Sequence, residues 1–328
     1  MNLSLAKVAA ASDEEWDRTW LKCDSATYFH SREWSEVWGA YQRAKTRPHP
    51  LKAIFSDGKQ VVLPLSSRKA LKGLVKRFLS SPAGTYGGWI SSEELTPAHV
   101  RLLVEFLTRE LGPLDWRLNP YDLILRATVI PGAKDDETHA LDLRPGFAAV
   151  SAEWSHGQAA LARKVRKAVR EGVTVTPAEA EPDWRAYFDV YEQSLARWAD
   201  QATSRYRWNL FSELFHRRSP HHQLWLARRE ERVIAGALCF YSKAHAIYWH
   251  GAALEEFFPL RPVNLLMHDA IRDACARGCA WFDFNPSGDH EGVKAFKKSF
   301  GAQALPSPVV KITPRWRHAV RRLFREKV

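Results

Sequence analysis

The feature that most constrains the fold of this chain is a pattern that occurs twice. In each half a helix-like segment ends at a glycine, and an aromatic-rich strand then reaches Asn-Pro seven residues later. The first copy runs from Gly112 to Asn119 and the second from Gly278 to Asn285. A predicted hairpin precedes both copies. We interpret the repeat as a duplicated unit of hairpin, crossover helix and strand; two unrelated βαβ pieces are the alternative.

The N-terminal half has clear signals for each element of such a unit. Tryptophans recur at helical spacing before and after Ser31, which suits a helix N-cap. Asp57-Gly58 between two apolar runs is a strong hairpin signal. The predicted elements are, in order, a helix over 13–41, a hairpin of 51–55 with 61–65, a helix over 97–112 and a strand over 115–119.

The C-terminal half repeats this order after a basic helix that ends at Gly172 and leads into a Val-Thr strand. The segment PGAKDDETHALDLRPGF, residues 131–147, reads as a linker or an edge strand, and the boundary between the halves is expected near 135–155. The predicted elements that follow are a helix over 184–198, a hairpin of 223–227 with 233–241, a strand over 246–251, a helix over 262–278 and a strand over 281–285.

Composition limits the class of protein. The chain has 328 residues, about two domains' worth, and its hydrophobic content of 45% is enough for ordinary cores. No apolar run reaches the roughly 18 residues that a membrane span needs. The first residues lack the long apolar core of a signal peptide, and the four cysteines form no CxxC pair. We therefore expect a cytoplasmic protein with reduced, buried thiols.

The net charge of +11 favours an anionic partner, although a basic but inert surface is the alternative. Residues 68–79 read as a basic amphipathic helix or loop, and residues 315–327 as a basic amphipathic helix. Together they suit either the inner membrane surface, with a lipid-linked acceptor, or a tRNA that carries an aminoacyl group. Each segment alone is equally well explained as a core-packed helix with a charged outer face.

Residues 281–301, WFDFNPSGDHEGVKAFKKSFG, bring together a carboxylate, an amide and several amines at a predicted strand end. Open α/β sheets usually place their chemistry at such a strand end. The sequence therefore directs attention to this segment as the site.

The ordered set RKAVREGV, a hairpin, a helix that ends in glycine, FDF and then FKKSFG resembles the FemABX-like branch of the GNAT acyltransferase superfamily. The match is best over 150–310 and weaker over 30–120. The resemblance implies an α/β (α+β) fold of two tandem GNAT-like domains, each a mixed sheet flanked by helices. The expected domains are 1–145, 146–312, which carries the site, and a basic C-terminal helix over 313–328.

The resemblance also implies transfer of an acyl or aminoacyl group to an amine, with acyl-CoA or aminoacyl-tRNA as co-substrate. It implies neither a metal nor a permanently bound cofactor. In bridge-forming members a Phe-Lys pair lies at the reaction centre, and Phe296 and Lys297 match it. The sequence departs from the family twice. Asn285 replaces the glycine that often follows FDF, and FFPLRPVNLL lacks the glycines of a CoA-pyrophosphate loop.

Three residues are the candidates for catalysis. Lys297 is predicted to stabilise the developing oxyanion or to position a donor; a solvated lysine is the alternative. Asp283 is predicted to act as base or to orient a lysine, and it equally suits a structural ion pair. Phe296 is predicted to wall the acyl site, unless it is only a core aromatic.

The substrate-binding candidates have similar alternatives. The Asn285 amide suits a substrate carbonyl or a turn, and His250 suits a base or a structural histidine. Arg261 lies at a helix N-terminus that favours an anion. The full set is Asn285, His250, Tyr248, Arg261, Lys164 and Arg166.

Two functions from different classes follow. The first is an acyltransferase that acts on an amine of a cell-envelope precursor or sugar in a bacterial cytoplasm, with peripheral membrane contact left open. The second is a non-catalytic protein that binds tRNA or a membrane through a degenerate GNAT scaffold. Loss of turnover in Lys297→Ala with binding kept separates them.

Overall fold

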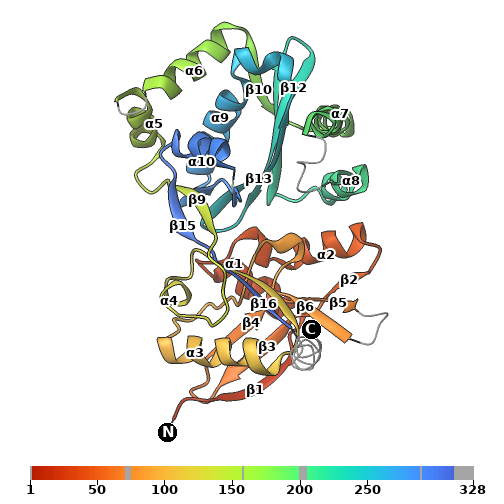
Figure 1. Ribbon diagram of the computed structural model, residues 1–328, viewed down its shortest axis with the longest axis vertical. Helices are drawn as coiled ribbons and strands as arrows, with labels where there is room; N and C mark the ends of the chain where they lie inside the picture. Colours follow the sequence, from red (N-terminus) through yellow and green to blue (C-terminus); the bar gives the residue numbers. More distant parts are fainter. Residues whose placement is uncertain (1, 71–74, 157–158, 199–204, 289, 314–328) are drawn as a thin grey trace, which may run out of the picture. The chain divides into compact units, whose positions relative to one another are not determined.

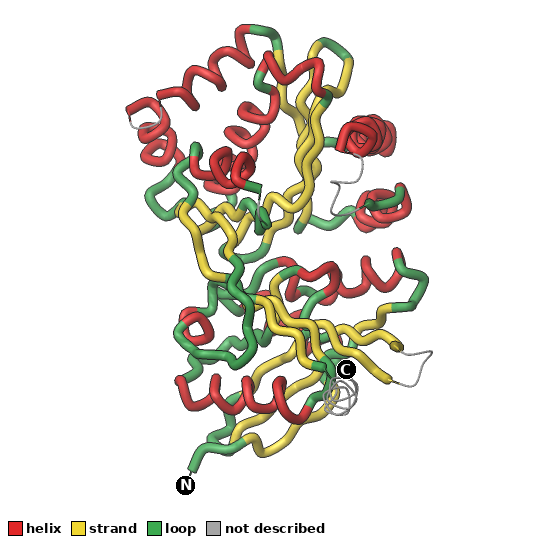
Figure 2. The backbone as a smooth tube through the Cα atoms, viewed as in Figure 1, coloured by secondary structure: helices red, strands yellow, loops and turns green. Residues whose placement is uncertain are grey.

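The computed structural model describes residues 2–70, 75–156, 159–198, 205–288 and 290–313 (Figure 1). The chain divides into two compact units. One holds Met1–Asp136 with the chain from Pro306 on, and the other holds Glu137–Leu305. Both units combine helices with sheets, which confirms the α/β class predicted from sequence (Figure 2). The predicted helix over 313–328 lies outside the described residues, apart from its first residue.

The N-terminal unit begins with a strand and two capped helices. Its helical elements are α1 (Asp13–Lys22), η1 (Tyr28–His30), α2 (Arg32–Tyr41), η3 (Pro82–Gly84), α3 (Pro97–Glu105), the π-helical turn η4 (Phe106–Glu110) and α4 (Leu123–Arg126). Its strands are β1 (Leu5–Ala10), β2 (Thr46–Pro48), β3 (Leu51–Phe55), β4 (Gln60–Leu63), β5 (Ser66–Ala70), β6 (Val75–Leu79), β7 (Tyr86–Gly87), β8 (Leu114–Leu118) and β16 (Val309–Ile312).

The predicted helix over 13–41 is broken in two. The side chain of Ser31 accepts a hydrogen bond from the Trp34 N–H, so the predicted N-cap starts α2 rather than continuing α1. Strands β3 and β4 pair antiparallel around Asp57-Gly58 as predicted, and β1 extends their sheet. A second sheet has the order β16-β8-β6-β5-β2, with β7 beside β8.

The prediction of a helix or loop over 68–79 is wrong. Residues 66–70 and 75–79 are the antiparallel strands β5 and β6. In β6, Phe78 is buried in the core, and the exposed Lys76 lies two residues before it on the same face of the strand. Strand β6 pairs in parallel with β8, and helix α3 lies in the chain between these two strands. In this half the order of hairpin, helix and strand is therefore made by β5–β6, α3 and β8, and the duplication itself stays a prediction.

The C-terminal unit has one large mixed sheet with helices on both faces. Its helices are α5 (Phe147–His156), α6 (Ala159–Arg170), α7 (Glu181–Trp198), α8 (Trp208–Arg217), η6 (Glu255–Leu260), α9 (Pro262–Ala276) and α10 (Glu291–Lys298). Its strands are β9 (Glu137–Asp142), β10 (Val173–Pro177), β11 (His222–Arg229), β12 (Arg232–Tyr241), β13 (His245–Ala253), β14 (Trp281–Asp283) and β15 (Gln303–Pro306).

The strand order of this sheet is β10-β11-β12-β13-β14-β9-β15. Helices α7 and α8 lie on one face, and α5, α6, α9 and α10 lie on the other (Figure 1). Strands β13 and β14 pair in parallel only from His245 to Ile247, because β14 is short. The far half of β13 therefore continues to Ala253 without β14 beside it.

The reading of 135–155 as a linker or edge strand is wrong for residues 137–142. These residues form β9, which lies between β14 and β15 inside the sheet. Its central residues, 138–141, are buried on both faces, which is the burial of an interior strand. The compact units thus give residues 137–145 to the second unit and 306–312 to the first, whereas the expected domain limits of 1–145 and 146–312 stay a prediction.

Candidate active site

The site predicted from sequence begins at the end of β14. Asp283 is the last residue of this strand and is fully buried between β13 and β9. Its Oδ1 accepts a hydrogen bond of 2.6 Å from the hydroxyl of Thr138 on β9. The backbone N–H of Asn285 donates to the same oxygen, also at 2.6 Å. Short hydrogen bonds of this kind stabilise a carboxylate that burial has removed from water.

Asn285 connects this carboxylate to the next element through its backbone. Its φ of 64° is left-handed, which glycine adopts freely and asparagine tolerates better than most residues. This turn directs the N–H back toward Asp283, while the carbonyl oxygen accepts a hydrogen bond from Nζ of Lys297. Asparagine and glycine both adopt this left-handed conformation, so Asn285 suits the position where the family resemblance leads one to expect glycine.

Lys297 lies near the end of α10 and is only 3% exposed. Burial lowers the pKa of its ammonium to about 8, and the nearby charge of Asp283 partly opposes that shift. A group with this pKa is still mostly charged near pH 7. Asp283, Asn285 and Lys297 thus form a connected unit, in which a buried amine is held at a strand end by a backbone carbonyl.

Phe296 is half-buried on α10 and packs against the core of the unit. Its ring lies 5.1 Å from that of Phe300, and Phe300 lies 5.5 Å from Phe284 after β14. These ring contacts attach α10 to the sheet beside Asp283, and so help to fix Lys297. A role for Phe296 as a wall of the acyl site stays a prediction.

Two residues of this region were missed by the sequence reasoning. Thr138, described above, and His139 both come from β9, which was read as a linker or edge strand. His139 is fully buried, and among the described residues neither ring nitrogen has a hydrogen-bond partner. Desolvation lowers the pKa of His139, and three lysines of α10 act in the same direction: Lys297, Lys298 and Lys294. Leu141, Asp142 and Leu143 alternate at the end of ETHALDL, and this short pattern was the available signal for the strand.

His250 and Tyr248 lie on opposite faces of β13. The register with β12 shifts between Leu238 and Cys239, so a bulge at Trp249 separates the two side chains. Tyr248 packs on the core face together with α9. Burial raises the pKa of its hydroxyl.

His250 faces helices α7 and α8 instead. The hydroxyl of Tyr187 lies 2.6 Å from its Nδ1, and the ring of Tyr191 lies 4.5 Å away. Desolvation among these rings lowers the pKa of His250 to about 3, so the imidazole is neutral at any physiological pH. This geometry gives His250 a packing role, and its predicted part in substrate binding stays a prediction.

The remaining candidates lie on other elements of the same unit. Lys164 is half-buried and Arg166 is exposed on α6, a helix that packs against α9. Arg261 is exposed and caps α9 with a left-handed φ of 64°. The structure thus brings Asp283, Asn285 and Lys297 into one cluster, whereas these three cations stand on α6 and at the start of α9.

The turn before α9 offers few backbone donors to a pyrophosphate. The amides of Phe257, Arg261 and Asn264 donate to carbonyl groups within the turn. Pro259 and Pro262 have no N–H. Two carboxylates, Glu255 and Glu256, stand in the same turn. The side-chain Nδ2 of Asn264 is buried without a partner among the described residues. The turn therefore fits the phosphates of CoA poorly.

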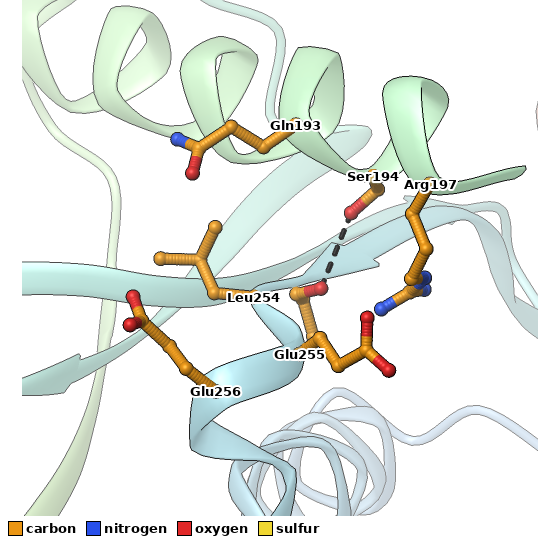
Figure 3. Close-up of a pocket in the computed structure, with 7 residues that line it drawn as sticks. Gln193, Ser194, Arg197, Leu254, Glu255 and Glu256 are labelled. Atoms are coloured by element: carbon orange, nitrogen blue, oxygen red, sulfur yellow. Dashed lines mark hydrogen bonds between the residues drawn. The ribbon is translucent and has the colours of Figure 1, made fainter. Parts of the chain in front are cut away.

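A pocket of about 270 Å³ lies between α7 and the end of β13 (Figure 3). The hydroxyl of Ser194 at its edge donates to the Ala253 carbonyl oxygen over 3.2 Å. Its lining residues are Gln193, Ser194, Arg197, Ala253, Leu254, Glu255 and Glu256. It contains none of the residues predicted from sequence.

Among the residues that the structure describes, no group of three or more His, Cys, Asp or Glu side chains is arranged to hold a metal ion. No helix among them is long and apolar enough to cross a membrane.

This chain resembles known proteins in sequence over one region and in fold over most of its length. Residues 155–298 match the family described as Acetyltransferase (GNAT) domain. The structure is similar to FemX, with a TM-score of 0.68 and 13% identity, over 92% of this chain and 96% of FemX. It is also similar to a conserved protein of unknown function from Bacteroides thetaiotaomicron (TM-score 0.60, 10% identity, covering 94% of this chain and 100% of that one).

A third similar structure is the C-terminal domain of a protein assigned as a lysylphosphatidylglycerol synthetase, from Agrobacterium fabrum. Its TM-score is 0.52 at 16% identity, over 75% of this chain and 80% of that one. No curated protein matches the sequence. At these identities the likeness concerns the fold. Residues 155–298 are thus a GNAT acetyltransferase-type domain, and the whole chain has the fold of FemX, as the resemblance to the FemABX-like branch predicted.

Proposed function

We propose that this protein transfers an acyl or aminoacyl group to an amine, and that the transfer takes place beside Lys297. The observation that carries the proposal is the buried ammonium of Lys297, which Asn285 holds next to the buried Asp283. Opposite charges removed from water are costly to bury, and perturbed buried groups at a strand end are typical of functional sites.

The chemistry is aminolysis of a thioester or ester. The neutral amine attacks the carbonyl carbon, a C–N bond forms, and the carbonyl electrons move to oxygen. The oxyanion then collapses, the bond to the leaving group breaks, and that group takes up the proton that the amine loses. In this proposal the ammonium of Lys297 donates to the oxyanion, since a donor held in a dry site needs no rearrangement as charge develops.

Asp283 acts on Lys297 rather than on the substrate in this proposal. Its Oδ1 already accepts two hydrogen bonds, from Thr138 and Asn285. Its negative charge favours the protonated form of Lys297 against the effect of burial. Phe296, next to Lys297 in sequence, is the proposed wall for the acyl group. Asp283 is therefore a positioning residue.

The donor favoured here is an aminoacyl-tRNA rather than acyl-CoA. The support is the turn before α9, where prolines and internal hydrogen bonds leave few amides for a pyrophosphate. Arg261, Lys164 and Arg166 are the proposed contacts for donor phosphates. The proposed acceptor is an amine of a cell-envelope precursor or sugar, reached from the cytoplasm.

Transfer assays with purified protein test the proposal. Wild type is offered acyl-CoA and charged tRNA pools together with amine acceptors, and donor binding is followed by the rise in melting temperature. Lys297→Ala is expected to lose at least about a hundredfold in rate while it keeps donor binding. Lys298→Ala, an exposed neighbour, is the matched control and is expected to retain transfer. Donor binding without any transfer by wild type would instead support the non-catalytic alternative.

A further inference from the structure

The edge of the larger N-terminal sheet carries an unbalanced positive charge. Within residues 43–81 of the sequence, the only carboxylate is Asp57. That carboxylate lies 3.0 Å from Nε2 of His99, so it pairs away from the sheet edge. The cations of β2, β5 and β6 and of the residues just before β2 are Arg43, Lys45, Arg47, Arg68, Lys69, Lys76 and Arg77.

Strands β5 and β6 place four of these cations directly opposite one another. Arg68 pairs with Arg77, and Lys69 pairs with Lys76. Like charges at directly opposed positions of a β-ladder destabilise it. Because neighbouring residues of a strand point to opposite faces, the arginine pair lies on one face of this hairpin and the lysine pair on the other.

The two faces differ in how their charge is compensated. On the arginine face, Asp115 of β8 pairs with Arg77, and it lies 3.5 Å from Arg68. On the lysine face, Lys76 lies 3.1 Å from a ring nitrogen of His49 and over the ring of Phe78. Among the described residues, no carboxylate forms an ion pair with Lys69 or Lys76 on that face.

The adjacent strand β2 extends the same surface. It pairs with β5 at the edge of the sheet and carries the exposed Arg47 opposite Ser67, on the lysine face. The exposed Arg43 and Lys45 come immediately before it. The edge formed by β2, β5 and β6 (Figure 1) is here called the basic edge. It carries cations on both faces of its hairpin.

We propose that the basic edge docks this protein on an anionic phospholipid bilayer. A hairpin that enters a layer of headgroups edge-on meets phosphates on both faces, so both like-charge pairs are neutralised together. A nucleic-acid strand approaches one face, and sequence-tolerant binding of such a strand usually adds exposed aromatic rings for stacking. Phe78, the aromatic residue of β5 and β6 as described, is buried instead.

Vesicle binding tests this proposal without any donor or acceptor. The full-length chain is mixed with vesicles of phosphatidylcholine alone or with phosphatidylglycerol added, and the bound fraction is measured by flotation. Each cation near an anionic surface contributes about 1 kcal/mol, so Lys69→Gln with Lys76→Gln should lower the partition coefficient about thirtyfold. The same change should leave the melting temperature unchanged or higher, because it removes a repulsive pair.

The matched control is Lys7→Gln with Arg101→Gln, which removes the same charge from two other exposed positions of this unit. It should keep most of the binding. Equal losses in both double variants would mean that net charge alone acts, and would overturn the docking surface. So would equal binding to uncharged vesicles, or preference for RNA over anionic vesicles at matched salt. Transfer activity does not enter the readout, so a failure here leaves the proposed acyl transfer untouched.

Discussion

Nζ of Lys297 donates a hydrogen bond to the carbonyl oxygen of Asn285, twelve residues earlier in the chain. The same residue, Asn285, donates its N–H to the carboxylate of Asp283. One peptide turn therefore holds a buried ammonium and a buried carboxylate at fixed positions. This arrangement requires a left-handed residue after the strand, a short turn, and a helix that returns over the sheet.

The first prediction concerns the pH dependence of transfer. If the ammonium of Lys297 stabilises the oxyanion, kcat/KM should fall as pH rises through about 8, because the group loses its proton there. In Lys297→Arg the guanidinium stays charged, so this decline should be absent. A rate that rises through the same pH in wild type, but not in the arginine variant, would make Lys297 a base instead.

The second prediction concerns stability. The pKa of Lys297 is about 8 in the folded protein and 10.5 for an ordinary lysine, so the unfolded chain binds more protons between these values. The destabilisation caused by burying this ammonium is therefore fully present below pH 8. The free energy of unfolding must rise with pH between about 8 and 10.5. Relative to Lys297→Met, wild type should gain up to about 3 kcal/mol from neutral pH to the upper limit. Urea unfolding at each pH measures the difference, and a flat difference would contradict the burial.

The third prediction concerns the turn at Asn285. Asn285→Gly keeps both backbone hydrogen bonds and suits a φ of 64°, so its stability should stay within about 1 kcal/mol of wild type. Asn285→Val should lose about 1–3 kcal/mol, because a β-branched residue is strained in this conformation. Transfer should survive in the glycine variant. Loss of transfer in a stable Asn285→Gly protein would assign the work to the side-chain amide, as the sequence reasoning had it.

The fourth prediction concerns His139. A buried polar group without a partner costs about 1–3 kcal/mol, so an apolar side chain of similar volume should stabilise the protein. His139→Leu is therefore expected to raise the denaturation midpoint, whereas Thr138→Val, which removes a made hydrogen bond to Asp283, should lower it. If His139→Leu destabilises instead, the imidazole has a partner such as bound water. A stabilised His139→Leu with reduced transfer would mark the residue as part of the site.

Much of the C-terminal unit was predictable, because its signals are local. Glycine at 278 ends a helix, FDF alternates, and the residues after Asn285-Pro286 form a turn. These patterns follow from backbone stereochemistry and hydrophobic periodicity, which act over a few residues. The same reasoning singled out three residues that the structure brings into one cluster: Asp283, Asn285 and Lys297.

The sequence-based predictions failed where a short segment fits both the helical and the strand periodicity of apolar residues. Residues 68–79 fit an amphipathic helix as well as a strand pair, and only pairing with β2 and β8 decides between them. Strand β9 was misread for a related reason. Its polar flanks suggest exposure, whereas insertion between β14 and β15 buries its centre.

The sequence by itself indicated the order of elements in the C-terminal unit and the GNAT-like class, and it directed attention to the segment that contains Lys297. Tertiary structure alone decided which groups meet there. Thr138 and Asp283 are 145 residues apart in sequence, and their contact exists only because β9 pairs with β14. The bulge that turns His250 away from Tyr248 is likewise a property of strand register. Local stereochemistry is written in neighbouring residues, whereas burial, register and the pKa of Lys297 depend on what the folded chain packs around them.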